Sequence, residues 1–226
     1  MAGPLFGWPA ARAVPLIKIC GIRTPQMAVH AAEAGADMIG VVHFAPSPRH
    51  LDAAGAATVA DAVRGSAMVV ALVVDAEDAA LDTLVETARP DAIQLHGKET
   101  PERATAIAAR YRLPVSKAHG IGTAADLPAI TTFNALPVLD AKPPKGADRP
   151  GGHGAAFDWS ILTEIDRARQ FMLSGGLTAE NVATAVATVR PYAVDVSSGV
   201  EIDGEKDAGR IVAFIDAVRR GSASAG

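Results

Sequence analysis

Cys20 and Asp140 are the residues of this 226-residue chain whose types and positions best suit proton transfer. Cys20 is the single cysteine and ends an apolar run, residues 16–20, and Asp140 ends another, residues 137–140. A thiol acts as a base only when it is ionised, and a carboxyl group can give or take a proton. A lone cysteine is also commonly a small buried apolar side chain, so the surrounding elements must decide between these interpretations.

The alternation of side chains along a strand predicts where these two groups point. If residues 16–20 form a strand, Lys18 and Cys20 share one face and the two isoleucines share the other. We expect the isoleucines to face covering helices, which leaves Lys18 inside and Cys20 above it at the mouth of a closed sheet. The same alternation places Asp140 on the inner face with Val138. Cys20 and Asp140 should therefore meet at one mouth from roughly opposite sides.

Lys18 has two possible roles below Cys20. A nearby cation favours the ionised thiolate, so Lys18 could activate the base. Alternatively, Lys18 forms a structural ion pair inside the sheet with Asp195 of the adjoining strand, and this is the interpretation that we favour. The sequence leaves open how Cys20 becomes ionised.

Two glycine-rich loops indicate a phosphate site. Residues 173–177 (LSGGL) and 196–200 (VSSGV) follow consecutive apolar runs near the C-terminus of the chain. Glycine lets backbone N–H groups approach an oxyanion closely, and serine hydroxyls add donors. The loops at residues 75–78 and 96–99, expected on the opposite side, contain no such glycine pair or Ser-Gly turn. We therefore expect a substrate with one phosphate group.

The elements that must position these groups alternate between short β-branched runs and alanine-rich helical segments. Eight such pairs predict a single (β/α)₈ barrel, an α/β fold whose active site lies at the C-terminal ends of the parallel strands. An open doubly wound sheet is the alternative, but no Gly-x-Gly-x-x-Gly motif follows the first strand. The strands are expected at residues 16–20, 38–43, 68–74, 92–95, 114–117, 137–140, 170–173 and 192–196.

Capping signals mark several of the helices between these strands. Thr24 and Thr100 each precede a proline, as expected for an N-cap followed by proline in the first turn. Thr123 and Thr178 are further candidate N-caps. Gly35 is expected to end the first helix.

Net charge, cysteine content and the N-terminal residues indicate which partners and which compartment to expect. A net charge of −4 without runs of like charge argues against nucleic-acid or membrane partners, and the single cysteine argues against a disulfide framework. The start of the chain lacks the order of a signal peptide, so we expect a cytoplasmic protein. We expect an N-terminal extension at residues 1–14, a barrel domain at 15–220 and a flexible tail at 221–226. The chain is expected to be a monomer or a homodimer.

Together, the motifs of this chain resemble those of phosphoribosylanthranilate isomerase, the barrel enzyme of the tryptophan pathway. The resemblance extends from about residue 16 to residue 218. The most specific motifs are at residues 17–22 and 194–201. The segments that carry the resemblance are 17–22 (IKICGI), 34–37 (AGAD), 47–49 (SPR), 94–97 (QLHG), 140–142 (DAK), 151–152 (GG), 157–159 (FDW), 173–177 (LSGGL) and 194–201 (VDVSSGVE).

The resemblance implies a cofactor-free Amadori rearrangement of N-(5-phosphoribosyl)anthranilate. Asp140 matches the family's general acid, which protonates the furanose ring oxygen so that the ring opens to a Schiff base. Cys20 matches the general base, which removes the proton from C2 of the sugar. No cofactor or metal is needed, because the nitrogen of the substrate acts as the electron sink.

The same resemblance assigns the binding residues. Arg49 matches the position that holds the anthranilate carboxylate, for which a guanidinium has suitable bidentate geometry. His96 is a second candidate for substrate binding, although a histidine at a strand end can also serve only to fix its loop. The phosphate cradle would consist of Gly175, Gly176, Ser198 and Gly199. The loop at residues 142–154 is longer than the pattern requires, and we interpret it as a lid over the site.

Three other functions remain as alternatives. A histidine-pathway or dual-substrate isomerase would carry two phosphates and would have an aspartate in place of Cys20. A metal-dependent epimerase using His43 and His96 would need acidic ligands at neighbouring strand ends, where we expect Val74 and Lys117. A non-catalytic barrel that binds a phosphorylated metabolite would not need both Cys20 and Asp140.

Overall fold

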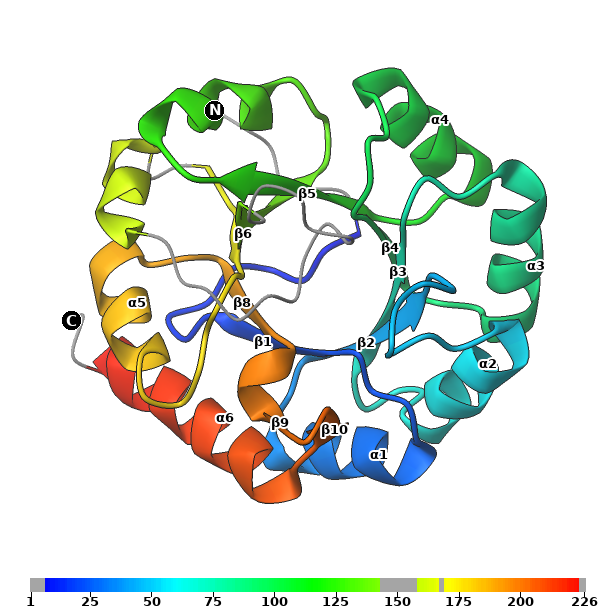
Figure 1. Ribbon diagram of the computed structural model, residues 1–226, viewed down its shortest axis with the longest axis horizontal. Coiled ribbons are helices and arrows are strands. Elements are labelled where there is room, and N and C mark those ends of the chain that lie inside the picture. The colour runs from blue at the N-terminus through cyan, green and yellow to red at the C-terminus, as the bar shows by residue number, and fades with distance from the viewer. Residues whose placement is uncertain (1–6, 143–157, 167–168, 224–226) are drawn as a thin grey trace.

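Eight parallel strands close into a barrel in the computed structural model, which describes residues 7–142, 158–166 and 169–223 (Figure 1). Neighbouring strands follow chain order, and the last strand pairs with the first. This confirms the expected barrel and excludes the open sheet. The strands are β1 (Leu16–Cys20), β2 (Met38–His43), β3 (Met68–Val73), β4 (Ala92–Leu95), β5 (Val115–Ile121), β6 (Leu136–Ala141), β7 (Met172–Leu173) and β8 (Ala193–Val196).

Helical segments surround the barrel, and a small hairpin follows β8 (Figure 1). Within the described residues, 3-10 segments rather than α-helices follow β5 and β6. No described helix is long and apolar enough to span a membrane. The helical segments are α1 (Pro25–Ala34), α2 (Ala53–Ala62), α3 (Asp78–Ala88), α4 (Pro101–Tyr111), η1 (Ala124–Thr131), η2 (Trp159–Glu164), α5 (Val182–Val189), η3 (Ser198–Val200) and α6 (Ala208–Ala223), and the hairpin consists of β9 (Glu201–Ile202) and β10 (Glu205–Lys206).

Most of the capping signals are confirmed. The hydroxyl groups of Thr24 and Thr100 each accept a hydrogen bond from the backbone N–H three residues later, and Gly35 ends α1 with a φ of 110°. Thr123 begins a 3-10 segment rather than an α-helix. Thr178 is not the cap of α5, because the chain first makes a turn and the helix begins only after Asn181.

The barrel interior is layered, as the strand alternation predicts. Ile17 and Ile19 belong to the core between strands and helices, whereas a separate apolar cluster that includes Met38 fills the lower interior. Above this cluster, the fully buried Lys18 donates a hydrogen bond to Asp195 at 2.9 Å. The favoured interpretation of Lys18 as a partner of Asp195 is therefore confirmed.

Strand β5 extends further toward the mouth than expected. It extends to Ile121 rather than ending at Lys117, so Lys117 lies within the strand and not at its mouth. The side chain of Lys117 shares the outer face with Val115 and pairs with Glu99 at 2.9 Å. The expectation that Lys117 lies at the end of its strand was therefore wrong. Strand β7 is also two residues shorter than expected at its start.

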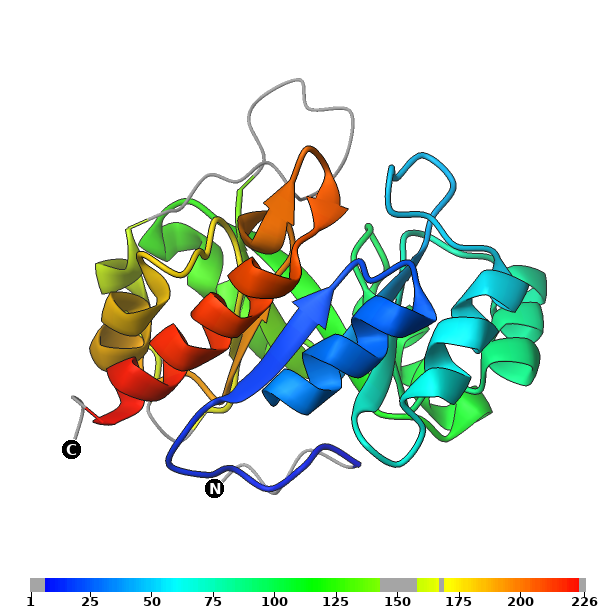
Figure 2. The ribbon, with the colours of Figure 1, turned by 90° about the horizontal axis from the view of Figure 1, so that it is seen from below.

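The described part of the expected N-terminal extension contacts the base of the barrel, opposite the hairpin β9–β10 (Figure 2). Trp8 packs against the lower interior cluster, and the Tyr192 hydroxyl donates to the carbonyl of Pro9 at 2.7 Å. Arg12 forms an ion pair with Asp37. At the other terminus, α6 continues to Ala223, so the first residues of the expected tail are helical.

Because His119 on the outer face of β5 is buried, we expect the stability of the fold to depend on pH. Its ring lies edge-on to Phe133, and its Nε2 has no hydrogen-bond partner among the described residues. Burial, together with the charges of Lys117 and Arg169, lowers the pKa of His119 to about 4.

Between pH 6.5 and pH 4 the unfolded chain therefore binds more protons at this residue, and stability falls as the pH falls. We predict that the free energy of unfolding decreases by about 2 kcal/mol from this group between pH 7 and pH 4.5. Urea unfolding of wild type and His119→Leu at both pH values checks this. An equal pH dependence in the two proteins would contradict it.

Candidate active site

The C-terminal ends of the strands bring the two expected catalytic groups to one mouth. Cys20 ends β1 and Asp140 lies at the end of β6, and both side chains are almost completely buried. His96 follows β4, and Arg49 lies in the loop after β2. All four residues therefore come from different strands or loops at the face where barrel enzymes place their catalytic groups.

Cys20 lies in an apolar environment with one cation below it. Val42 and Leu72 form a cluster with it at the top of the barrel interior. Burial raises the pKa of the Cys20 thiol, and the positive charge of Lys18 offsets this only in part. Lys18 thus pairs with Asp195 and also interacts with the thiol, but burial outweighs its effect on the pKa of Cys20.

Gly40 on β2 provides the space for Cys20. A Cβ atom at this position would lie 2.9 Å from both the Sγ and the Cα of Cys20. Any larger residue would therefore displace the thiol or the end of β1. This requirement is invisible in the sequence, because Gly40 lies in an otherwise ordinary apolar strand.

Asp140 is approached by a histidine that has its own supporting contact. His96 Nε2 lies 3.5 Å from Asp140 Oδ2, and Gln94 Nε2 lies 3.3 Å from His96 Nδ1. When the Gln94 amide donates to Nδ1, the proton of His96 is on Nε2 and points toward the carboxylate. Gln94 is fully buried, so it fixes the ring from inside the barrel. His96 thus contacts the expected acid.

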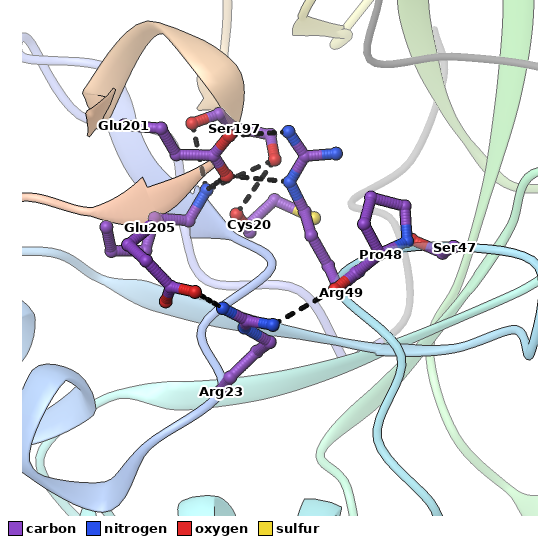
Figure 3. Close-up of polar contacts among 9 residues, drawn as sticks. Cys20, Arg23, Ser47, Pro48, Arg49, Ser197, Glu201 and Glu205 are labelled. Atoms are coloured by element: carbon purple, nitrogen blue, oxygen red, sulfur yellow. Dashed lines mark hydrogen bonds and ion pairs between the residues drawn. The ribbon is translucent and has the colours of Figure 1, made fainter. Parts of the chain in front are cut away.

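Arg49 is held by the hairpin after β8 (Figure 3). Its Nε and Nη2 donate to the two carboxylate oxygens of Glu201, each at 2.6 Å. Lys206 donates to the same carboxylate at 2.6 Å. Burial disfavours a charged Glu201, but the hydrogen bonds from Arg49 and Lys206 keep its pKa below the ordinary value.

Ser197 connects this ion-pair network to the strand that carries the thiol. Lys206 Nζ donates to the carbonyl and hydroxyl oxygens of Ser197, and the Ser197 hydroxyl donates to the carbonyl of Cys20 at 3.1 Å. Gly21 then lets the arginine lie across the backbone, because a Cβ there would come 2.5 Å from Arg49 Cδ and its φ is +81°. Gly21 therefore provides the space that the side chain of Arg49 needs.

A second ion pair lies further out on the same hairpin (Figure 3). Arg23, in the loop after β1, pairs with Glu205 and donates to the carbonyl of Pro48 at 3.1 Å. Glu205 is largely exposed. This outer pair connects the hairpin to the loop after β1, whereas the pair between Arg49 and Glu201 connects it to the loop after β2, and the outer pair lies at the surface.

The two glycine-rich loops pack directly against each other. A Cβ at Gly199 would overlap the carbonyl oxygen of Leu177, and a Cβ at Gly175 would overlap the backbone nitrogen of Ala141. Gly175 and Gly176 both have positive φ values, 83° and 64°. Ser198 and Gly199 form the first turn of η3, where N–H groups have no acceptor within the helix. The glycines thus allow the loops after β7 and β8 to pack closely together.

The loops on the opposite side of the mouth use their donors differently. Glu99 accepts hydrogen bonds from the backbone N–H groups of Asp75 and Gly97, and Asp75 accepts one from Lys98. Side-chain carboxylates therefore occupy these backbone N–H groups, and the expectation of a single phosphate site stays a prediction.

Several residues of the site were missed from the sequence. Glu201 and Lys206 received no role, although Glu201 closes the 194–201 motif, and Gln94 was only part of a quoted segment. Apart from Lys142, the expected lid at residues 142–154 lies outside the described residues. Within the described residues, no group of three His, Cys, Asp or Glu side chains is arranged to hold a metal ion.

Because Cys20 is buried, we predict that its thiol reacts slowly with iodoacetamide and mainly at alkaline pH. Only the thiolate reacts, and the chain has a single cysteine, so the rate reports this residue alone. We predict that the modification rate rises with pH and has its midpoint above about 8.5, the ordinary value for a thiol. The control is the same protein unfolded in urea. A midpoint at or below that of the unfolded chain would contradict the raised pKa of Cys20.

Comparison of the sequence with protein families gives a match over most of the chain. The family described as N-(5'phosphoribosyl)anthranilate (PRA) isomerase matches residues 17–217. The N-(5'-phosphoribosyl)anthranilate isomerase of Rhodopseudomonas palustris (strain BisA53) is 51% identical over 207 residues, which cover 90% of this chain and 95% of that protein. The protein of the same name from Brucella canis is 48% identical over 206 residues, 89% of this chain and 93% of that protein.

Solved structures agree with this match. The phosphoribosyl anthranilate isomerase of Thermotoga maritima superposes with a TM-score of 0.82 at 37% identity and covers 91% of this chain and 98% of its own. A phosphoribosyl anthranilate isomerase solved in complex with reduced 1-(o-carboxyphenylamino)-1-deoxyribulose 5-phosphate superposes with a TM-score of 0.79 at 33% identity, with the same coverage.

Proposed function

The chain belongs to the N-(5'-phosphoribosyl)anthranilate isomerase family, and from this premise we propose how its own residues perform the reaction. It converts N-(5'-phosphoribosyl)anthranilate into 1-(2-carboxyphenylamino)-1-deoxyribulose 5-phosphate in tryptophan biosynthesis. The observation that carries the assignment of roles is that Cys20 and Asp140 lie at the C-terminal ends of two strands of one barrel, at the same mouth.

Asp140 starts the reaction as the general acid. Its proton goes to the furanose ring oxygen as the bond between this oxygen and C1 breaks, and the lone pair of the anthranilate nitrogen forms a C1=N double bond. The resulting iminium ion makes the proton on C2 acidic. The contact from His96 Nε2 supports this role, because an N–H directed at Asp140 stabilises the carboxylate left after proton transfer.

Cys20 then acts as the general base. Its thiolate takes the proton from C2, the electron pair forms a C1=C2 bond, and the iminium nitrogen becomes neutral. The enolamine tautomerises to the ketone, with the nitrogen of the substrate serving as the electron sink throughout, so we propose that no cofactor is required. A positioned proton-transfer group contributes about 10²–10⁴-fold to the rate. Lys18, which interacts with the thiol from below, favours its ionised form.

The binding groups are proposed at the two ends of the substrate. Arg49 binds the anthranilate carboxylate, supported by its position above Cys20 (Figure 3). The phosphate cradle consists of Gly175, Gly176, Ser198 and Gly199, supported by the positive φ values and the close packing of these loops. His96 is proposed to contact the bound sugar from the side of Asp140.

The domain bounds, compartment, oligomeric state and partners of the protein are also part of the proposal. We propose one catalytic domain at residues 15–220 that works in the cytoplasm as a monomer or homodimer, without a nucleic-acid or membrane partner. A free thiol that must stay reduced suits a reducing compartment, and the net charge is −4. Among the described residues, few large apolar side chains are exposed, namely Val29, Ile202 and Val212.

Loss of anthranilate fluorescence from N-(5'-phosphoribosyl)anthranilate measures turnover. We predict that Cys20→Ser and Asp140→Asn each lower kcat/KM by at least about 100-fold, since each removes a proton-transfer group. Asp82→Asn is the matched control, because this exposed carboxylate pairs with Arg110 on the outside of the barrel. Full activity in either site variant would overturn its role, and no fluorescence loss with wild type would overturn the function itself.

A further inference from the structure

We infer that Glu201 is a positioning residue that presents Arg49 to the carboxylate of the substrate and thereby sets the selectivity for carboxylated aryl amines. This inference rests on the proposed function of Arg49. It adds a role for the hairpin β9–β10, whose two ends carry Glu201 and Lys206.

The geometry of the Arg49 guanidinium leaves one of its edges available for a ligand. Glu201 occupies only one edge of it, through Nε and Nη2, and Nη1 points away from Glu201 (Figure 3). The edge formed by Nη1 and Nη2 can still donate two parallel hydrogen bonds to a second carboxylate. Because the guanidinium is planar, fixing one edge also fixes the plane in which that second carboxylate must lie.

The charges of Arg49, Glu201 and Lys206 also couple these three side chains. Arg49, Glu201 and Lys206 have exposed side-chain fractions of only 13%, 7% and 5%, so their interactions are weakly screened. The two cations share one carboxylate, which leaves one formal positive charge for the substrate. Without Glu201, Arg49 and Lys206 would repel each other, and Arg49 would lose the contact that holds it in place.

This network is also connected to the strand that carries the expected base, Cys20. Lys206 also holds Ser197, whose hydroxyl donates to the carbonyl of Cys20. The same cluster therefore fixes the arginine relative to the end of the strand that carries the thiol. A carboxylate bound at Arg49 would be placed in a defined position with respect to Cys20.

The hairpin also provides a matched control. Glu205 pairs with Arg23 much as Glu201 pairs with Arg49, and both pairs connect the hairpin to another loop. Glu205, however, is 71% exposed, and its pair lies outside the network around Cys20. An exposed pair of this kind contributes little to stability.

The test measures binding by calorimetry with two probes: reduced 1-(o-carboxyphenylamino)-1-deoxyribulose 5-phosphate and the otherwise identical phenylamino compound without the carboxyl group. For wild type we predict tighter binding of the carboxylated probe. In Glu201→Gln its Kd should rise at least 10-fold while that of the other probe changes little. Glu205→Gln should bind both probes as wild type does.

A further variant separates positioning from folding. Glu201→Asp keeps a negative charge beside Lys206 but shortens the reach to Arg49, so we predict an intermediate loss for the carboxylated probe alone. Thermal unfolding of each variant confirms that the native state is compared. In turnover assays, Glu201→Gln should raise KM with a much smaller change in kcat, as expected when binding is lost equally in ground and transition states.

Two results would overturn the inference. Equal preference for the carboxylated probe in Glu201→Gln and wild type would show that Arg49 needs no support from Glu201. An equal loss of affinity for both probes would indicate a general structural effect instead. If wild type bound neither probe, the proposed function would fail, and this inference would fail with it.

Discussion

The ion pair between Lys18 and Asp195 is the interaction on which the rest of the site depends. It joins the first and last strands of the barrel in a fully buried layer, and Ser174, which follows β7, interacts with the same carboxylate at 3.3 Å. A buried pair adds little net stability, but breaking it costs about 3–5 kcal/mol because one charge is left unpaired. The pair therefore favours one register between β1 and β8, and in that register the end of β1 lies beside the loop after β8, where the Ser197 hydroxyl donates to the carbonyl of Cys20.

At the mouth above this layer, glycines that leave room for neighbouring groups matter as much as contacts between side chains. Gly40 leaves room for the thiol of Cys20, Gly21 lets Arg49 cross the chain, and Gly199 allows the last two strand loops to touch. Ion pairs and hydrogen bonds then connect these crowded loops to one another. The reactive groups are thus held by short-range contacts between segments that are far apart in the sequence.

Strand alternation was sufficient to predict the barrel interior, because the period of two is strict and one inward residue determines the rest. It placed Lys18, Cys20 and Asp140 on inner faces and paired Lys18 with Asp195. It did not predict the end of β5, which was expected at Lys117, because β5 continues to Ile121 by pairing with β6, which is a non-local contact. The roles of Glu201 and Lys206 were also missed, since a two-residue strand pair has no periodicity and its contacts with Arg49 are non-local.

The central claim is that one ligand spans the mouth from the glycine-rich loops to Arg49 and passes between Cys20 and Asp140. A crystal structure of the protein with reduced 1-(o-carboxyphenylamino)-1-deoxyribulose 5-phosphate tests this most directly. We predict phosphate at Gly176 and Ser198, the aryl carboxylate on Arg49, and C2 within about 3.5 Å of Cys20 Sγ, as a near-attack geometry requires. A ligand bound in the reverse direction, or with C2 remote from Cys20, would contradict it.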